Sequence, residues 1–158
     1  MLSWQQEAEL HSKQCYPEEA CGLVYIFKGK TKYKACKNIS INPKDTFIID
    51  PLEYAEIFDK ASIIGVFHSH PIEQPYPTPA DKAICEKYKY KWHIYSVDFN
   101  NWYSFEPSGY KAPLVGREYV FGIHDCWSLI RDYFETLNIK LRDWDRPINP
   151  QDFCDNPY

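Results

Sequence analysis

Two histidines, His68 and His70, stand two residues apart at the end of an apolar, β-branched run over residues 62–67. A run of this length and composition predicts a β-strand, in which the side chains of residues two apart point to the same face. If the strand continues through the pair, both imidazoles face one side and can share a metal ion. No other feature constrains the fold of this chain as strongly.

A helix start follows the two histidines. Thr78 is a preferred N-cap residue, Pro79 suits the first helical position, and Asp81 falls in the first turn, where a carboxylate is favoured. The strand end and the helix start together offer two imidazoles and one carboxylate, the ligand types of a catalytic zinc site whose fourth position is left to water. A His-x-His pair alone is more often a surface or packing feature, so the interpretation depends on the added helix start.

Composition limits the classes of function. The 158 residues suffice for one full domain and little more, and 44% of them are hydrophobic, so a core is possible. The net charge of −4 without a basic stripe argues against nucleic acid as the main partner. The N-terminus lacks the basic and apolar pattern of a secretory signal, and no stretch approaches the eighteen apolar residues of a membrane span. The six cysteines form no C-x-x-C pair, so reduced thiols are expected.

The periodicity predicts an α/β (α+β) chain with a mixed sheet and flanking helices. A composition change at residues 107–116 predicts a linker between a domain at 1–106 and a short, incomplete, helix-containing segment at 117–158. In chain order, we expect a helix at 3–15, a central strand at 21–27, strands at 31–37 and 46–49, a helix from 51 to about 60, the strand beginning at 62, a helix from 78 to about 90, strands at 92–97 and 101–105, and a helix from 126 to about 137.

The spacing His-x-His-x7-Thr-x-x-Asp, formed by His68, His70, Thr78 and Asp81 with Glu19 upstream, resembles the JAMM signature of the MPN-plus zinc peptidases. That family has Ser where this chain has Thr78. The resemblance implies a JAMM/MPN, cytidine deaminase-like architecture and Zn²⁺ held by the two histidines and the aspartate. It also implies hydrolysis of an amide or isopeptide bond by metal-activated water.

The resemblance covers roughly residues 1–105 and assigns two further roles. Glu19 would be the general base; its neighbour Glu18 is the alternative, and the position just before Cys21-Gly22 favours Glu19. Thr78 could cap the helix and still donate to an oxyanion, because a hydroxyl has one donor and two acceptor sites. Ser69, between the histidines, is expected to point to the opposite face and to be structural.

A second motif begins at residue 122. Gly122 to Cys126 and the following helix resemble the start of an NlpC-type cysteine peptidase domain, which makes Cys126 a candidate nucleophile. A thiol at a helix start is favoured as thiolate. The base of such a domain is a downstream histidine, and none follows Cys126 in these 158 residues; His124 is too near in sequence to be assumed in that role. Either a longer chain completes this unit, or the unit packs or binds without catalysis.

A JAMM domain followed by an NlpC-type domain is similar to the tail assembly protein K family of lambda-like phages. This resemblance implies other phage tail-tip proteins as partners and a peptide, isopeptide or peptidoglycan cross-link as substrate. It places the protein in the host cytoplasm during assembly or at the virion tail tip. Two alternatives stay open: a cysteine endopeptidase acting on peptidoglycan through Cys126 in a longer chain, and a structural tail-tip subunit without catalysis.

Overall fold

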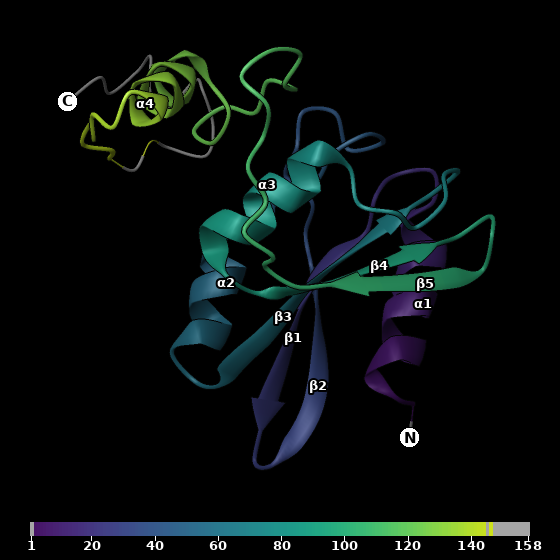
Figure 1. Ribbon diagram of the computed structural model, residues 1–158. Helices are drawn as coiled ribbons and strands as arrows, with labels where there is room; N and C mark the ends of the chain where they lie inside the picture. The colour runs from purple at the N-terminus through teal and green to yellow at the C-terminus, as the bar shows by residue number, and fades with distance from the viewer. Residues whose placement is uncertain (1, 145, 147–158) are drawn as a thin grey trace. The chain divides into compact units, whose positions relative to one another are not determined.

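The computed structural model describes residues 2–144 and 146 (Figure 1). Within them, five strands form one sheet in the order β2-β1-β3-β4-β5. The strands are β1 (Cys21–Phe27), β2 (Lys30–Cys36), β3 (Ser62–His70), β4 (Lys91–Ser96) and β5 (Asn101–Phe105), and the helices are α1 (Trp4–Cys15), α2 (Pro51–Phe58), α3 (Pro79–Tyr88) and α4 (Cys126–Thr136).

The sheet is mixed, as predicted. β3 pairs with β4 in parallel, and the other three pairings are antiparallel. The strand expected to be central, β1, is interior, whereas β3 occupies the middle of the sheet. β3 continues through His70, so His68 and His70 meet the condition for facing the same side of the sheet.

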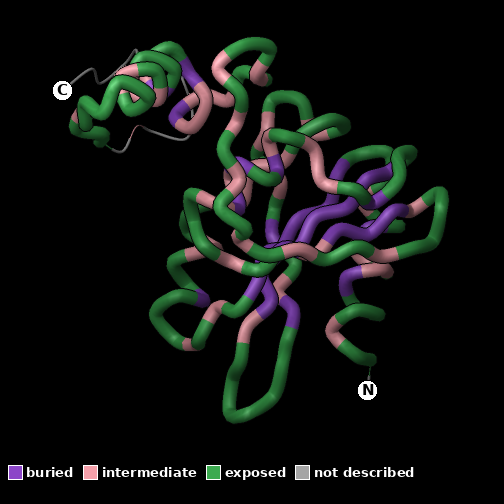
Figure 2. The backbone as a smooth tube through the Cα atoms, viewed as in Figure 1, coloured by how far each residue is buried: buried purple, intermediate pink, exposed green. Residues whose placement is uncertain are grey.

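The core lies where α1 meets the sheet. Ser3 and Gln6 form the capping box that begins α1, and Ala8 is buried with Val24, Phe67 and other residues in one cluster. Figure 2 shows that the buried residues are concentrated in the middle strands of the sheet. Gly22 has room for no side chain, because an added Cβ would lie 2.4 Å from the Lys34 carbonyl oxygen and 2.5 Å from the ring of Tyr33. The Tyr33 ring therefore closes over this position of β1.

The prediction of a strand at residues 46–49 is wrong. Its only ladder contact is an isolated bridge between Asn38 and Ile49. The side chain of Asn38 takes the backbone groups that a strand would pair: its Oδ1 accepts from Ile48 N–H at 3.1 Å and its Nδ2 donates to Thr46 O at 3.1 Å. The segment is therefore a loop folded around one amide side chain.

The other expected elements are present. Their ends differ by at most two residues, except that β3 runs three residues past the expected 62–67, through His70. α2 begins after the Asp50 cap, as the sequence predicts, but ends at Phe58 instead of near residue 60. α3 ends at Tyr88, and Lys89 follows in a left-handed conformation with φ of 60°. These small shifts are typical of helix ends, which carry weak local signals.

The chain divides into two compact units, Met1–Tyr76 with Lys89–Pro107, and Pro77–Tyr88 with Ser108–Tyr158. In the second unit, the Glu86 carboxylate accepts backbone N–H groups of Ser108, Gly109 and Tyr110 at 2.5, 2.7 and 3.0 Å. These bonds connect α3 to the segment after β5. Asp125 caps α4 by accepting from Ser128 N–H at 2.9 Å.

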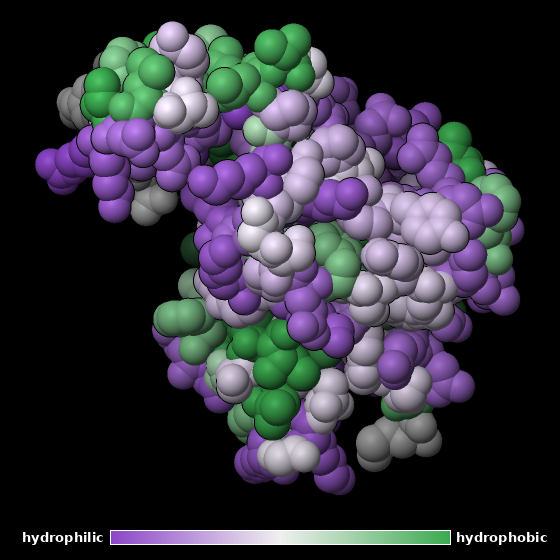
Figure 3. All heavy atoms as spheres, in the orientation of Figure 1, coloured by the Kyte–Doolittle hydropathy of each residue, from purple (hydrophilic) through white to green (hydrophobic). Residues whose placement is uncertain are grey.

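The surface of the first unit has an apolar area near α2 and the start of β3, visible in Figure 3. Leu52 and Phe58 are exposed there, and Ile64 is partly so. Among the described residues, no helix is long and apolar enough to cross a membrane. The five described cysteines are free thiols, and Cys154 lies outside the described residues.

Candidate metal centre

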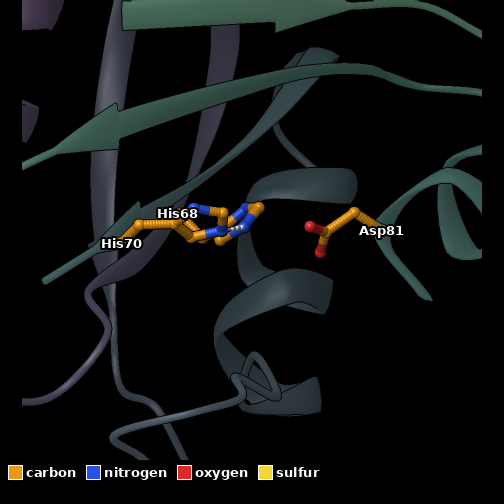
Figure 4. A group of neighbouring side chains, drawn as sticks. All are labelled: His68, His70 and Asp81. Atoms are coloured by element: carbon orange, nitrogen blue, oxygen red, sulfur yellow. Dashed lines mark hydrogen bonds between the residues drawn. The ribbon is translucent and has the colours of Figure 1, made fainter. Parts of the chain in front are cut away.

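Three side chains converge at one point of the structure. His68 and His70 come from the end of β3, and their Nε2 atoms lie 3.1 Å apart. Asp81 comes from the first turn of α3. One ligand atom from each of the three residues lies within 4.8 Å of the others, and all three residues are buried (Figure 4). The structure therefore contains a buried His-His-Asp group of the kind that holds a metal ion.

The ring of His70 is held by the loop that follows β3. Its Nδ1 lies 2.8 Å from the carbonyl oxygen of Gln74, which can only accept a hydrogen bond. Nδ1 therefore carries the proton, and Nε2 presents a lone pair. Asn101 Nδ2 donates to Gln74 Oε1 at 3.2 Å, and Val97 N–H donates to His70 O at 3.0 Å. The loop is thus fastened to the β4–β5 turn, which fixes the imidazole.

The ring of His68 is held by aromatic side chains. Phe47 stacks on it, with centroids 4.6 Å apart and planes inclined by 22°. Trp92 meets the same ring edge-on, with centroids 5.4 Å apart and an angle of 76°. The two rings pack against the imidazole from different directions, which restricts its rotation. Because both rings are largely apolar, they also keep water from it.

Asp81 is held by a reciprocal pair of hydrogen bonds at the helix start. Its backbone N–H donates to Thr78 Oγ1 at 3.1 Å, and its carboxylate accepts from Thr78 N–H at 2.8 Å. Thr78 is therefore the N-cap and Asp81 the third helical residue, as the sequence predicts. The carboxylate receives one backbone donor, the kind of outer contact that orients a metal ligand.

The donor set fits a zinc ion. Two imidazoles bound at about 2.0–2.1 Å in a tetrahedral site have nitrogen atoms roughly 3.3 Å apart, close to the separation observed here. Two neutral nitrogens and one carboxylate also match the ligand composition of catalytic zinc sites with an open fourth position. The Nε2 atoms of His68 and His70 are within hydrogen-bond distance, so without a metal one of them donates its N–H to the other. A bound cation would take the place of that hydrogen atom.

The pairing of β1 with β3 brings the backbone of Glu19 next to the strand end that carries the two histidines. It directly precedes Ala20 and β1, whose first residue, Cys21, is paired with His68. Ser69 N–H donates to Ala20 O, and Ala20 N–H donates to Ser69 Oγ, both at 2.9 Å. Glu19 is buried, and it is not a member of the metal-ligand group.

Ser69, His11 and His93 each have a hydrogen-bond partner within the first unit. Ser69 is fully buried, and its hydroxyl serves the Ala20 N–H. His11 pairs with Tyr33 Oη at 2.8 Å, and His93 pairs with Ser104 Oγ at 2.8 Å. Among the described residues, neither of these two histidines belongs to the group that could hold a metal ion.

Sequence reasoning missed two residues that contact the candidate ligands, Phe47 and Gln74, and it missed Asn38, whose side chain bonds to the backbone of Glu19 and to both neighbours of Phe47. Asn38 and Phe47 belong to a stretch that looked like loop and short strand, and Gln74 belongs to a proline-rich loop. The sole available signal was indirect. A rigid loop with prolines at 71, 75 and 77, directly after two candidate ligands, is suited to presenting a backbone carbonyl at a fixed place.

Cys126 is exposed at the first position of α4. Among the described residues, no hydrogen bond joins its thiol to His124 or to any other side chain. Burial and the charge of Arg117 lower the pKa of His124. The buried Asp125 carboxylate accepts from Gly122 N–H at 3.0 Å and pairs with Arg146 at 2.7 Å. The segment around Cys126 is thus organised by Asp125, the helix cap.

Comparison with known proteins connects this geometry to relatives. Tail tip assembly protein K of Escherichia phage N15 is 34% identical over 151 residues, which cover 94% of this chain and 62% of that protein. Tail tip assembly protein K of Escherichia phage lambda is 24% identical over 98 residues, covering 62% of this chain and 47% of the lambda protein. The chain therefore spans less than two thirds of the length of these relatives.

A solved structure shares the fold. The solution structure of protein DSY2949 from Desulfitobacterium hafniense matches with a TM-score of 0.53 and 24% identity, over 65% of this chain and 79% of that one. The family model described as prokaryotic homologs of the JAB domain matches residues 2–106, the part that carries β1 to β5 and all three ligand candidates. The resemblances to the JAMM/MPN fold and to tail assembly protein K are confirmed, whereas the resemblance of residues 117–158 to an NlpC-type domain stays a prediction. The chain belongs to the family of prokaryotic homologs of the JAB domain.

Proposed function

We propose that this protein is a zinc-dependent peptidase or isopeptidase of the JAMM type, which hydrolyses an amide bond. The observation that carries the proposal is the convergence of His68, His70 and Asp81 within 4.8 Å in a buried site. Membership in the JAB family supports it. A surface cluster of two histidines and a carboxylate would be weaker support, because exposed acidic groups are common without a metal.

The three ligands would hold Zn²⁺ through His68 Nε2, His70 Nε2 and the Asp81 carboxylate. When bound, such an ion lowers the pKa of a coordinated water to about 7 and polarises a carbonyl oxygen. The chain contributes the rest. Phe47 and Trp92 shield one ligand ring from solvent, which strengthens electrostatic interactions at the site.

Glu19 and Thr78 are the proposed partners of the metal. The carboxylate of Glu19 would take a proton from the attacking water and deliver it to the nitrogen of the leaving amine. Its burial and its place beside the paired residues Cys21 and His68 support this role. Thr78 Oγ1 accepts the Asp81 N–H, so its own hydrogen is available to stabilise a developing oxyanion.

The biological setting is proposed from the relatives. We propose that other phage tail-tip proteins are the partners, since both curated relatives are tail tip assembly proteins. The substrate class is an amide in a peptide, an isopeptide or a peptidoglycan cross-link. The corresponding locations are the host cytoplasm during assembly and the virion tail tip.

Metal analysis tests the assignment directly. Wild-type protein purified without chelator should contain close to one equivalent of zinc, and His68→Ala and Asp81→Ala should contain almost none. His11→Ala is the matched control, because His11 lies outside the ligand group and should leave the zinc content unchanged. Equal zinc in wild type and His68→Ala would end the metal assignment.

A second candidate function uses Cys126. We propose that residues 107–116 join the domain at 1–106 to an NlpC-type unit at 117–158, completed in a longer chain. The exposure of Cys126 at the start of α4 favours this reading. Inhibition of hydrolysis by a chelator but not by a thiol reagent would assign activity to the metal centre, and the opposite result would assign it to Cys126. Binding to tail proteins without hydrolysis of any peptide would favour a structural subunit.

A further inference from the structure

The side chain of Asn38 makes hydrogen bonds to backbone groups on both sides of the loop that follows β2. Its Nδ2 donates to Glu19 O at 3.0 Å and to Thr46 O at 3.1 Å. Its Oδ1 accepts from Ser40 N–H at 3.0 Å and from Ile48 N–H at 3.1 Å. Every close partner of the nitrogen is a carbonyl and every partner of the oxygen is an N–H, so only this orientation of the amide satisfies the contacts.

The first consequence concerns Glu19. Its carbonyl oxygen accepts from Asn38, and its N–H donates to Pro43 O at 2.7 Å. The next residue, Ala20, is fastened to Ser69 between the two histidines. The backbone of Glu19 is therefore held from one side by the loop and from the other by β3, which sets where its carboxylate can reach.

The second consequence concerns His68. The two backbone groups that Asn38 holds at Thr46 and Ile48 flank Phe47, whose ring stacks on the imidazole of His68. Backbone bonds also hold this loop: Ile39 N–H donates to Ile48 O at 2.9 Å and Thr46 N–H donates to Asn42 O at 3.0 Å, beside the isolated bridge between Asn38 and Ile49. The Asn38 amide adds one bond on each side of Phe47, so it contributes directly to keeping this ring on the imidazole.

We propose that Asn38 is a positioning residue that sets both the proposed base Glu19 and the proposed ligand His68 through one side chain. The inference rests on the proposed zinc site. Asp cannot replace Asn38 in this role, because a carboxylate has the same shape but no N–H donors. It would face two carbonyl oxygens and repel them, so the loop would shift away from both residues.

Asn38→Asp tests the proposal, with Asn42→Asp as the matched control. Asn42 is exposed in the same loop, and its contacts there are made by its backbone, so the control makes the same chemical change nearby. The first measurement is the NMR spectrum of the histidine rings in metal-free protein. Asn38→Asp should shift the signals of His68, because the stacked Phe47 ring moves, and should leave those of His93 in place as an internal check of folding.

The second measurement is the dissociation constant for Zn²⁺, obtained by competition with a chromogenic chelator. Changes in outer contacts of metal ligands typically weaken binding by about 10- to 100-fold, and we expect about tenfold for Asn38→Asp and less than about twofold for Asn42→Asp. Asn38→Ser, which introduces no charge, should show the same direction with a smaller effect and serves if Asn38→Asp does not fold.

If Asn38→Asp left the His68 signals unchanged and bound zinc as tightly as the Asn42→Asp control, the positioning role would be overturned. Failure of the wild type to bind Zn²⁺ would instead refute the proposed function. In that case the shift of the His68 signals would still report whether Asn38 holds Phe47 on the imidazole, so the two failures are distinguishable.

Discussion

Ala20 and Ser69 exchange two hydrogen bonds of 2.9 Å, one from each backbone N–H, with the Ser69 hydroxyl and the Ala20 carbonyl as acceptors. Ser69 lies between the two histidines of the candidate metal centre, and Ala20 directly follows Glu19. The exchange therefore connects β3, which carries the candidate ligands, with the candidate base, although 49 residues separate the partners along the chain.

Ser69→Ala should destabilise the protein without removing zinc. The substitution leaves the buried Ala20 N–H without its acceptor, which costs on the order of 1–3 kcal/mol in the free energy of unfolding. Urea unfolding followed by tryptophan fluorescence measures the loss. Ser62→Ala, at the exposed start of the same strand, should change the unfolding free energy by less than about 0.5 kcal/mol. Equal stability of the two variants would contradict the structural role of Ser69.

Glu19→Gln should keep zinc and lose turnover. Glutamine preserves the size of the side chain but cannot accept the proton, and a general base typically contributes about 10²- to 10⁴-fold. Turnover of a fluorogenic peptide or isopeptide that the wild type cleaves, together with metal content, provides the measurement. Glu18→Gln is the control, because Glu18 is the exposed neighbour. Loss of zinc from Glu19→Gln, or full turnover by it, would remove Glu19 from the proposed role.

Thr78→Ser should be tolerated, and Thr78→Ala should not. Serine keeps the oxygen that accepts the Asp81 N–H, whereas alanine removes the cap, a change that costs about 1 kcal/mol. Faster amide exchange at the start of α3 in Thr78→Ala reports the lost cap. If the hydroxyl also donates to an oxyanion, the same variant should lose about 10²- to 10³-fold in kcat. Wild-type kcat in Thr78→Ala would restrict Thr78 to capping.

His93 should make stability dependent on pH. Burial, with the nearby charge of Lys91, lowers the pKa of this imidazole to about 4. Below pH 6.5 the unfolded chain therefore binds a proton that the folded protein does not, and the free energy of unfolding falls as the pH drops from 6.5 towards 4. One proton gives at most about 1.4 kcal/mol per pH unit, and partial exposure of the ring reduces this.

Urea unfolding at several pH values between 7 and 4.5 checks the slope. His93→Gln keeps a polar side chain opposite Ser104 but removes the titrating group, so its unfolding free energy should depend less on pH in this interval. Identical slopes for wild type and His93→Gln would show that other groups cause the dependence.

Much of the fold could be predicted because its signals are local. The capping pair Ser3 and Gln6, the Asp50 cap and the Thr78-Asp81 pair each act within three residues, and the structure contains all three. The strand at 46–49 failed for the opposite reason. Asn38, at a distance of eight to ten residues, takes the backbone groups of Thr46 and Ile48, and no periodicity in the segment records that competition.

The sequence by itself determined which side chains are available to a metal and roughly how they are presented. The alternation of a strand puts His68 and His70 on one face, and the cap of a helix puts Asp81 in its first turn, because both follow from backbone geometry over a few residues. Only the tertiary structure decided that Phe47 stacks on His68, that Gln74 holds His70 and that Asn38 holds Glu19. Each of these contacts joins the site to a segment that lies apart from it along the chain. Packing and hydrogen bonding in three dimensions select the partners, and neither leaves a periodic pattern in the sequence.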